Sequence, residues 1–328
     1  MRIPTYLSNS SFQLFEKNRE SYYLKYLSDR RSPREPQEHA AAAGSSVDAY
    51  IKASLCHDLG LNDPKNEFDS LFASQVEKQN RDWALEEGRY VFECYKQSGF
   101  YASLLKETQQ SIETPRFEFT VEAVLNSVPF LGKPDGRWVS PGGVHVIHDF
   151  KLNGYCSKSP TSPHKSYQLC KDGFVGDKQN KSHGTEHKAY LAYQHGDMTI
   201  NTTYMEAANP AWADQLSLYA WALGEKIADE DVVLSIHQIV AKPIAGERPQ
   251  LRVAQYRARV KASYQLKLAE RLKACWDSII TGHIFTDMSR EDSDSRCAAL
   301  DDASVGLQSD GSSRDEFFNM ATRSPYRG

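Results

Sequence analysis

The sequence predicts an α+β fold, an α/β/α sandwich in which helices flank a central sheet. Up to residue 97 the apolar residues recur with helical spacing, whereas from Pro115 they alternate with polar residues as in strands. After residue 208 the chain returns to a helix, a strand and a longer helix. With 328 residues, 40% hydrophobic and 25% charged, the chain can bury a core and has the composition of a globular protein.

Residues 10–27 are predicted to form a helix or a helix pair, with Ser10 or Ser11 as the N-cap. A basic, proline-containing loop follows at residues 28–38. Its arginines could contact a phosphate backbone, or the loop could be an ordinary solvated charged surface.

Two further helices are predicted before the strands. Residues 40–55 have alanine-rich helical propensity, and Gly44 within them suggests close packing against a neighbour. Residues 69–97 form one long helical segment that ends at Gly99.

Three strands are predicted next, joined as a meander. Residues 117–123 alternate between apolar and polar side chains, which places Glu118 and Glu122 on the wet face of a half-buried strand. Residues 128–131 form the second strand. Residues 144–152 form the third, after a turn at Pro141-Gly142-Gly143.

The composition changes between residues 154 and 208, where the chain is polar and rich in lysine. We interpret this stretch as a long insertion that could act as a basic flap over the site, with Lys158 and Lys165 among its lysines. Three histidines there could also bind a metal, although their spacing matches no common motif: His164, His183 and His187.

The last part of the domain predicts a helix, a strand pair and a helix. Residues 210–223 form a helix capped by Asn209, and Gln215 and Tyr219 share one of its faces. Residues 232–241 form a strand whose hairpin partner is 251–256, and a long amphipathic helix then runs to residue 280.

We expect one domain over residues 1–285. Residues 286–328 would form an acidic, serine-rich linker followed by a short C-terminal segment.

A candidate site lies on the third predicted strand and just before it. Because side chains alternate along a strand, Asp149 and Lys151 point the same way, and Asp135 could join them at one end of the sheet. Two carboxylates and an amine so placed can hold a divalent cation and orient a water molecule. The alternative is an exposed hairpin with an ordinary surface ion pair.

Charge and hydropathy exclude some classes of protein. The formal net charge of −4 gives no global basic signature, although a local basic face remains compatible with it. The N-terminus lacks the apolar core of a signal peptide, and no run approaches the roughly 20 apolar residues of a membrane span. We therefore expect a cytoplasmic protein without a membrane partner. The six cysteines include no CxxC pair and predict neither a zinc site nor a disulfide framework.

Four motifs in order resemble the PD-(D/E)XK nuclease superfamily, in its RecB-like branch. They are the opening segment SNSSFQLFEKNRESYYLKYL, the AAAAGSSVDAYIKASL helix, Pro134-Asp135 with Asp149-Phe150-Lys151, and the QLSLY segment that begins at Gln215. The resemblance covers residues 8–285 and is interrupted by the polar insertion. It implies a restriction-endonuclease-like core, with a mixed central sheet and an N-terminal helical portion.

The resemblance also implies Mg²⁺- or Mn²⁺-dependent hydrolysis of DNA phosphodiesters, in recombination, repair or phage DNA processing. Asp135 and Asp149 would bind the metal, helped by Asp48 and the carbonyl of Phe150. Lys151 would orient the attacking water or stabilise charge. Gln215 and Tyr219 would position Lys151 or a phosphate, or would simply pack. The basic residues expected to contact DNA are Arg19, Lys25, Arg30, Arg31, Lys158 and Lys165.

The chain departs from the family pattern at two points. Asp48 stands where the branch has a histidine, and a carboxylate there suits a hard cation or marks an altered metal preference. The cysteines of the branch's iron–sulfur cluster are not matched, so we expect no cluster. The alternative functions are a non-catalytic DNA-binding or scaffolding protein with this fold and an unrelated α+β enzyme. A helicase or a recombination protein is a candidate partner, in the cytoplasm of a bacterium or a phage-infected cell.

Overall fold

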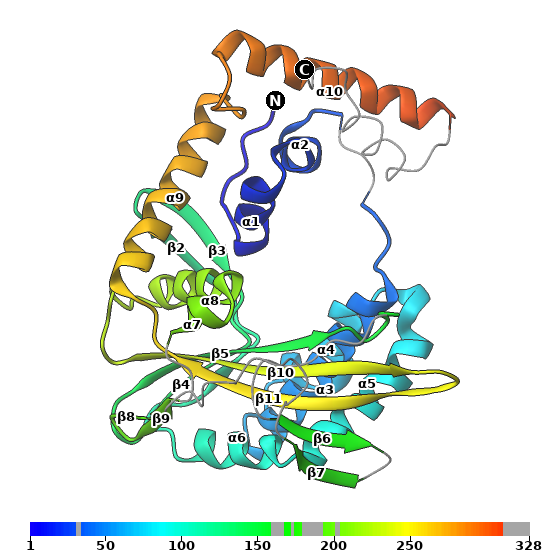
Figure 1. The fold of residues 1–328 in the computed structure, drawn as a ribbon, viewed down its shortest axis with the longest axis vertical. Coiled ribbons are helices and arrows are strands. Elements are labelled where there is room, and N and C mark those ends of the chain that lie inside the picture. Colours follow the sequence, from blue (N-terminus) through cyan, green and yellow to red (C-terminus); the bar gives the residue numbers. More distant parts are fainter. Residues whose placement is uncertain (31–33, 159–166, 172–173, 179–192, 201–203, 311–328) are drawn as a thin grey trace. The chain divides into compact units, whose positions relative to one another are not determined.

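The computed structural model describes residues 1–30, 34–158, 167–171, 174–178, 193–200 and 204–310 (Figure 1). The chain divides into two compact units, each assembled from separate segments. The first unit comprises Met1–Glu35, Val124–Leu131 and Lys267–Gly328, and the second comprises Pro36–Ala123 and Gly132–Leu266. Every residue of the predicted metal and catalytic site belongs to the second unit.

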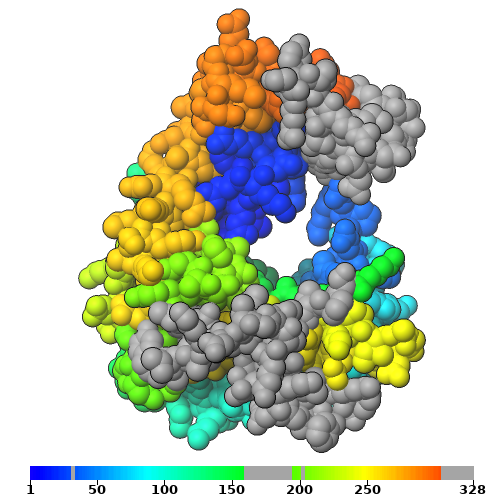
Figure 2. All heavy atoms as spheres, in the orientation of Figure 1, coloured from blue at the N-terminus to red at the C-terminus, as the bar shows by residue number. Residues whose placement is uncertain are grey.

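A mixed sheet forms the centre of the second unit. Its strand order is β1-β4-β5-β10-β11-β6-β7, and β5 and β10 run parallel, so the sheet combines parallel and antiparallel neighbours. The longest strands, β10 and β11, form the predicted hairpin, whose exposed tip lies at residues 245–248 (yellow in Figure 2). The bounds of the strands are β1 Arg116–Phe117, β4 Gly136–Val139, β5 His145–Asn153, β6 Tyr167–Lys171, β7 Phe174–Lys178, β10 Val232–Ile244 and β11 Glu247–Ala258.

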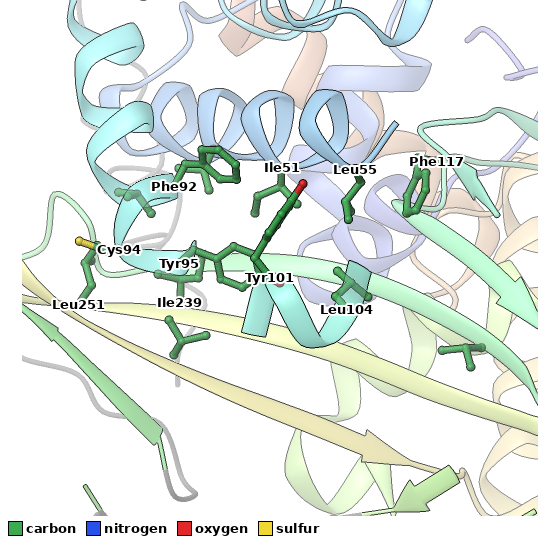
Figure 3. Close-up of a cluster of buried hydrophobic side chains, with 14 of the residues drawn as sticks. Ile51, Leu55, Phe92, Cys94, Tyr95, Tyr101, Leu104, Phe117, Ile239 and Leu251 are labelled. Atoms are coloured by element: carbon green, nitrogen blue, oxygen red, sulfur yellow. The ribbon is translucent and has the colours of Figure 1, made fainter. Parts of the chain in front are cut away.

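Helices cover both faces of this sheet, as the sequence predicted. On one face α3 (His39–Asp58), α5 (Arg81–Gln97) and α6 (Phe100–Gln109) pack on the strands. Figure 3 shows their apolar side chains meeting Ile239 of β10 and Leu251 of β11. On the other face lies α8 (Pro210–Ala222), which begins at the predicted cap Asn209 and packs Trp212 against Tyr256, with ring centroids 5.2 Å apart.

Two glycines explain how α3 meets its surroundings. A Cβ on Gly88 of α5 would lie 2.0 Å from Ser46 Oγ, so the close helix contact depends on that glycine. By contrast, a Cβ on Gly44 would meet nothing within 4 Å. The prediction of close packing at Gly44 is therefore wrong, and Gly44 instead lines an open cleft.

The predicted meander differs from the observed strands. The first strand breaks at Glu118, where the backbone has a φ of +47°, so β1 ends at Phe117 and β2 (Val121–Leu125) begins separately. β2 pairs only with β3 (Val128–Gly132) in a two-stranded sheet. In this part of the main sheet, β4 and β5 follow one another in the chain and pair as a hairpin.

Other segments also differ from expectation. The third predicted helix is divided into α4 (Phe68–Gln75), a 3₁₀ turn and α5. The described parts of the polar insertion include two strands, β6 and β7, which extend the main sheet. The insertion also contains a second hairpin and a short helix: β8 Tyr193–His195, β9 Met198–Ile200 and α7 Met205–Ala208.

The first unit is mainly helical. Helix α1 (Asn9–Lys17) begins with a capping box at Ser8, two or three residues before the predicted caps. It is followed by α2 (Arg19–Tyr22) and a π-helical turn (Tyr23–Leu27). The predicted long amphipathic helix is α9 (Ala262–Thr281). Within the described ranges, no helix combines the length and apolar character needed to cross a membrane.

Residues 290–310 differ from the predicted linker, since they form helix α10 (Arg290–Asp310). The helix buries Ser293, Cys297 and Leu300, a spacing of about one turn that the acidic, serine-rich composition concealed. Tyr23 Oη donates to Asp301 Oδ2 at 2.8 Å, and Ser28 Oγ donates to Asp301 Oδ1 at 2.5 Å. An acidic side chain thus anchors α10 to the N-terminal segment.

Candidate functional site

Asp135 lies just before β4, at the point where that strand leaves the edge of β5. The backbone N–H of Phe150 donates to Asp135 Oδ2 at 2.9 Å. In a strand the N–H and C=O of one residue point to the same neighbour, so the Phe150 carbonyl also points to the side of Asp135. The carbonyl is therefore on the side that its predicted role as a metal ligand requires.

Asp149 and Lys151 of β5 share one face of the sheet, as the strand spacing predicted. Lys151 Nζ lies 2.5 Å from Asp149 Oδ2. Gln215 of α8 contacts both residues, because its Oε1 accepts from Lys151 at 2.9 Å and its Nε2 donates to Asp149 Oδ1 at 2.8 Å. The hydroxyl of Tyr219, one turn later, lies 3.4 Å from Gln215 Nε2. These four side chains meet, and their chemical roles stay predictions.

A lysine that sequence reasoning missed stands at the other side of Asp135. Lys52 of α3 is fully buried, and its ammonium lies 2.7 Å from Asp48 Oδ2 and 2.8 Å from Asp135 Oδ1. It also forms an ion pair with Glu118. The signal in the sequence was the helical spacing, since Lys52 follows Asp48 by one turn on the same face.

Glu118 was predicted to lie on the wet face of a strand, and this prediction is wrong. Its side chain is only 9% exposed, and its two oxygens pair with Lys52 and Lys133. The left-handed backbone at this residue turns the carboxylate out of the strand alternation and toward α3. Such a conformation is unfavourable for a residue with a side chain and recurs at functional sites. Glu122, the other predicted wet-face residue, is exposed.

The electrostatics of Asp135 and Asp149 are opposite. Burial raises the pKa of Asp149 well above its usual range, and the neighbouring carboxylate of Asp135 adds to that effect. The pKa of Asp135 is lowered, because Lys52 and Lys151 together outweigh the effect of burial. Two adjacent carboxylates whose pKa values separate in this way are under charge repulsion, which a divalent cation would relieve.

Asp48 has one oxygen in use and one available. Its Oδ2 contacts Lys52 and accepts from Gln75 Nε2 at 3.0 Å. Its Oδ1 is buried and has no hydrogen-bond partner among the described residues. Burial, only partly offset by Lys52, raises the pKa of Asp48 to about 7. An unsatisfied buried carboxylate oxygen is a position that a cation would stabilise.

The acidic side chains together could hold a metal ion. One oxygen each of Asp48, Glu118 and Asp135 lie within 4.8 Å of one another. Oxygen ligands of this kind suit hard cations, without identifying which metal binds.

Two open clefts give access to these residues. One, of about 370 Å³, is lined by Gly44, Asp48, Asp135, Asp149 and Lys151, among others. The second, of about 1010 Å³, shares Glu118 and Lys133 with the first. It continues past four further residues with cationic or aromatic side chains: Lys65, Arg116, Phe117 and Phe119.

The residues predicted to contact nucleic acid belong to different parts of the chain. Arg19, Lys25 and Arg30 belong to the first unit. Arg19 donates to the Ile284 carbonyl at 3.1 Å, and Arg30 pairs with Asp302 at 3.3 Å, while Lys25 is exposed. Lys158, in the second unit, is also exposed. The other predicted basic or histidine residues lie outside the described residues: Arg31, Lys165, His164, His183 and His187.

Comparison with known proteins gives little more. No family model and no curated protein matches the chain. The crystal structure of SSO0001 aligns over 80% of this chain and 84% of its own, at 11% identity and a TM-score of 0.23. A score this low carries no argument about fold or function. The function must therefore be inferred from the residues themselves.

Proposed function

We propose that this protein is a divalent-metal-dependent deoxyribonuclease with a restriction-endonuclease-like core, as its PD-(D/E)XK, RecB-like motifs imply. One observation carries the proposal. Asp135, Asp149 and Lys151 converge beside β5, and Gln215 from α8 contacts both Asp149 and Lys151. Residues from separate motifs thus form one hydrogen-bonded cluster, which supports a role in metal-dependent phosphodiester hydrolysis.

The donor set fits a hard cation. Asp48 with its unpartnered Oδ1, Asp135, Asp149 and Phe150 all line the smaller cleft and offer oxygen ligands to it. When bound there, Mg²⁺ or Mn²⁺ would make water a better nucleophile and neutralise charge on the scissile phosphate.

The protein's own residues would align the reaction. Lys151 is 26% exposed and lines the smaller cleft, so its ammonium can donate to a water molecule or a phosphate oxygen while Asp149 and Gln215 fix its position. Burial raises the pKa of Tyr219 to about 12, which keeps its hydroxyl protonated and able to donate. Gln215 links these groups and limits their freedom to move.

The open clefts favour a polymeric substrate over an enclosed small molecule. The larger cleft carries Lys65 and Arg116, and the Arg116 guanidinium lies 3.9 Å from the centre of the Phe119 ring. Cations next to an aromatic ring are suited to contact phosphates and bases of a nucleic-acid strand. We infer that the strand extends from the site into this cleft.

The test uses end-labelled linear DNA and circular DNA with Mg²⁺ or Mn²⁺. Cleavage should vanish in excess EDTA and in Asp149→Asn, and should fall by roughly 10² to 10³ in Lys151→Met because a charge-stabilising donor is lost. Lys242→Met, which removes an exposed strand lysine outside the cluster, is the matched control and should keep wild-type cleavage.

Three results would contradict the proposal. Wild-type protein that leaves all DNA intact with either ion would remove the activity. Turnover that persists in EDTA would remove the metal. Equal rates for Lys151→Met and wild type, with both proteins folded by circular dichroism, would remove the catalytic lysine.

A further inference from the structure

Lys52 has no role in the proposed reaction, yet it stands among the acids that would bind the metal. We propose that its ammonium is a permanent cation of this centre, which fixes Asp48 and Asp135 as ligands and restricts the centre to one divalent ion. This inference rests on the proposed function for its metal, and it adds a positioning residue and a metal stoichiometry.

The ammonium of Lys52 is fully satisfied by carboxylates. A lysine ammonium has three N–H donors, and three acids lie around it. Asp48 Oδ2 is 2.7 Å away, Asp135 Oδ1 is 2.8 Å away, and Glu118 pairs with it as well. The lysine therefore occupies the very position that the acidic triad would otherwise offer to a metal ion.

The remaining oxygens define what is left for a metal. Both oxygens of Glu118 already pair with ammonium groups, one with Lys52 and the other with Lys133. Asp48 Oδ1 lacks a hydrogen-bond partner among the described residues, and Asp135 Oδ2 accepts one bond from Phe150 and keeps a second lone pair. Lys52 thus holds one oxygen of each aspartate and leaves the other oxygen available beside Asp149.

The formal charges favour one divalent ion over two. The cluster contains four carboxylates and three ammonium groups, so its formal net charge is one negative charge. The carboxylates are those of Asp48, Glu118, Asp135 and Asp149, and the ammonium groups are those of Lys52, Lys133 and Lys151. One divalent ion changes this to one positive charge, which the phosphodiester anion balances. A second ion would leave two uncompensated charges in a buried site, an arrangement that proteins rarely tolerate.

A metal ion is not expected to displace Lys52. The side chain is 1% exposed. If it moved away from the carboxylates, its ammonium would remain in the protein interior without a counter-charge. The lysine and the metal should therefore coexist, with Asp48 and Asp135 between them.

The experiment measures Mn²⁺ binding to the full chain by calorimetry, and thermal unfolding with and without EDTA, in the absence of DNA. Wild type should bind one Mn²⁺ per chain and stay folded in EDTA, because Lys52 already neutralises the triad. Lys52→Met should unfold at a lower temperature in EDTA, recover with Mn²⁺ by more than wild type does, and bind a second ion.

Glu118→Gln is a second variant that keeps the inference testable if Lys52→Met fails to fold. It keeps Lys52 and should still bind one Mn²⁺, with affinity changed by less than the roughly tenfold expected for loss of a residue that supports a metal ligand. Two ions on wild type, or a larger loss of affinity in Glu118→Gln, would overturn the inference. So would a Lys52→Met protein with wild-type stoichiometry and stability.

The outcomes also separate this inference from the proposed function. One bound ion and the expected behaviour of Lys52→Met, in a protein that cleaves no DNA, would uphold the role of Lys52 and overturn the nuclease. Two bound ions in an active nuclease would do the reverse. Absence of any Mn²⁺ binding would overturn both.

Discussion

Neighbouring residues of β5 belong to two different buried polar clusters. Asp149 points to the face covered by α8, where Gln215 and Lys151 contact it. His148, one residue earlier, points to the opposite face and lies in the core under α3, α5 and α6. The two clusters share a strand and a depth of burial, but they treat charge in opposite ways.

The cluster around His148 is neutral. His148 and His237 are fully buried, with ring centroids 4.7 Å apart. Burial lowers the pKa of both imidazoles well below the usual range. Ser235 Oγ lies 3.0 Å from His148 Nδ1, and Tyr95 Oη lies 2.6 Å from His237 Nδ1, so a neutral group contacts one nitrogen of each ring. The buried His148 Nε2 has no hydrogen-bond partner among the described residues.

The cluster around Asp149 pairs carboxylates with ammonium groups instead. Its carboxylates pair with ammonium groups on two sides, and its member Glu118 has a left-handed backbone conformation. The difference shows what each arrangement is suited to do. A neutral network stabilises the fold, whereas paired charges with an unused oxygen at Asp48 are suited to bind an ion.

Tyr95→Phe should give the largest difference between an effect on stability and an effect on metal binding. The variant leaves a buried His237 nitrogen without its partner, which should lower the free energy of unfolding by about 1–3 kcal/mol. Mn²⁺ affinity of the folded variant should be unchanged. Urea unfolding and calorimetric titration on the same sample test both statements, and a Mn²⁺ affinity that falls with stability would show that the clusters are coupled.

The pH dependence of stability should have opposite signs in the two clusters. The folded-state pKa of His237 is lowered, so as pH falls through about 6.5 only the unfolded chain gains a proton, and stability is lost. The folded-state pKa of Asp48 is raised to about 7, so its contribution is present at low pH and is lost as pH rises toward and through 7.

Two variants should separate these contributions in metal-free urea unfolding between pH 5.5 and 8. His237→Gln should remove a rise in stability between pH 5.5 and about 6.5, and Asp48→Asn should remove a fall in stability between pH 5.5 and about 7, each of at most about 1.4 kcal/mol per pH unit. Profiles parallel to wild type in both variants would place the titrating groups elsewhere.

The sequence was sufficient for contacts that follow from local period. The alternation of a strand put Asp149 with Lys151, and the helical repeat put Gln215 with Tyr219. Lys52 was missed because a lysine is normally exposed, and its acidic partners Glu118 and Asp135 lie 66 and 83 positions away in the chain.

The prediction that Glu118 lies on the wet face of a strand was wrong for a related reason. The alternation of its neighbours predicted a continuous strand, but the chain enters the left-handed region at that residue and the alternation ends. No local sequence pattern predicts this break in the strand, because the contacts that stabilise it come from Lys52 on a helix and from Lys133 beyond the next hairpin. Tertiary ion pairs therefore decided the part of the site that the sequence did not predict.

The smallest effects should come from one matched pair of glutamines. Gln75 donates to Asp48 at the charged cluster, and the Gln255 amide lies 2.8 Å from His237 Nε2 in the neutral one. Gln75→Ala should change stability by less than about 1 kcal/mol, because water can replace the half-buried amide, but should weaken Mn²⁺ binding up to about tenfold. Gln255→Ala should lower stability by about 1 kcal/mol and leave Mn²⁺ binding unchanged. If both variants altered the same property, the distinction between a cluster suited to ion binding and one suited to stability would fail.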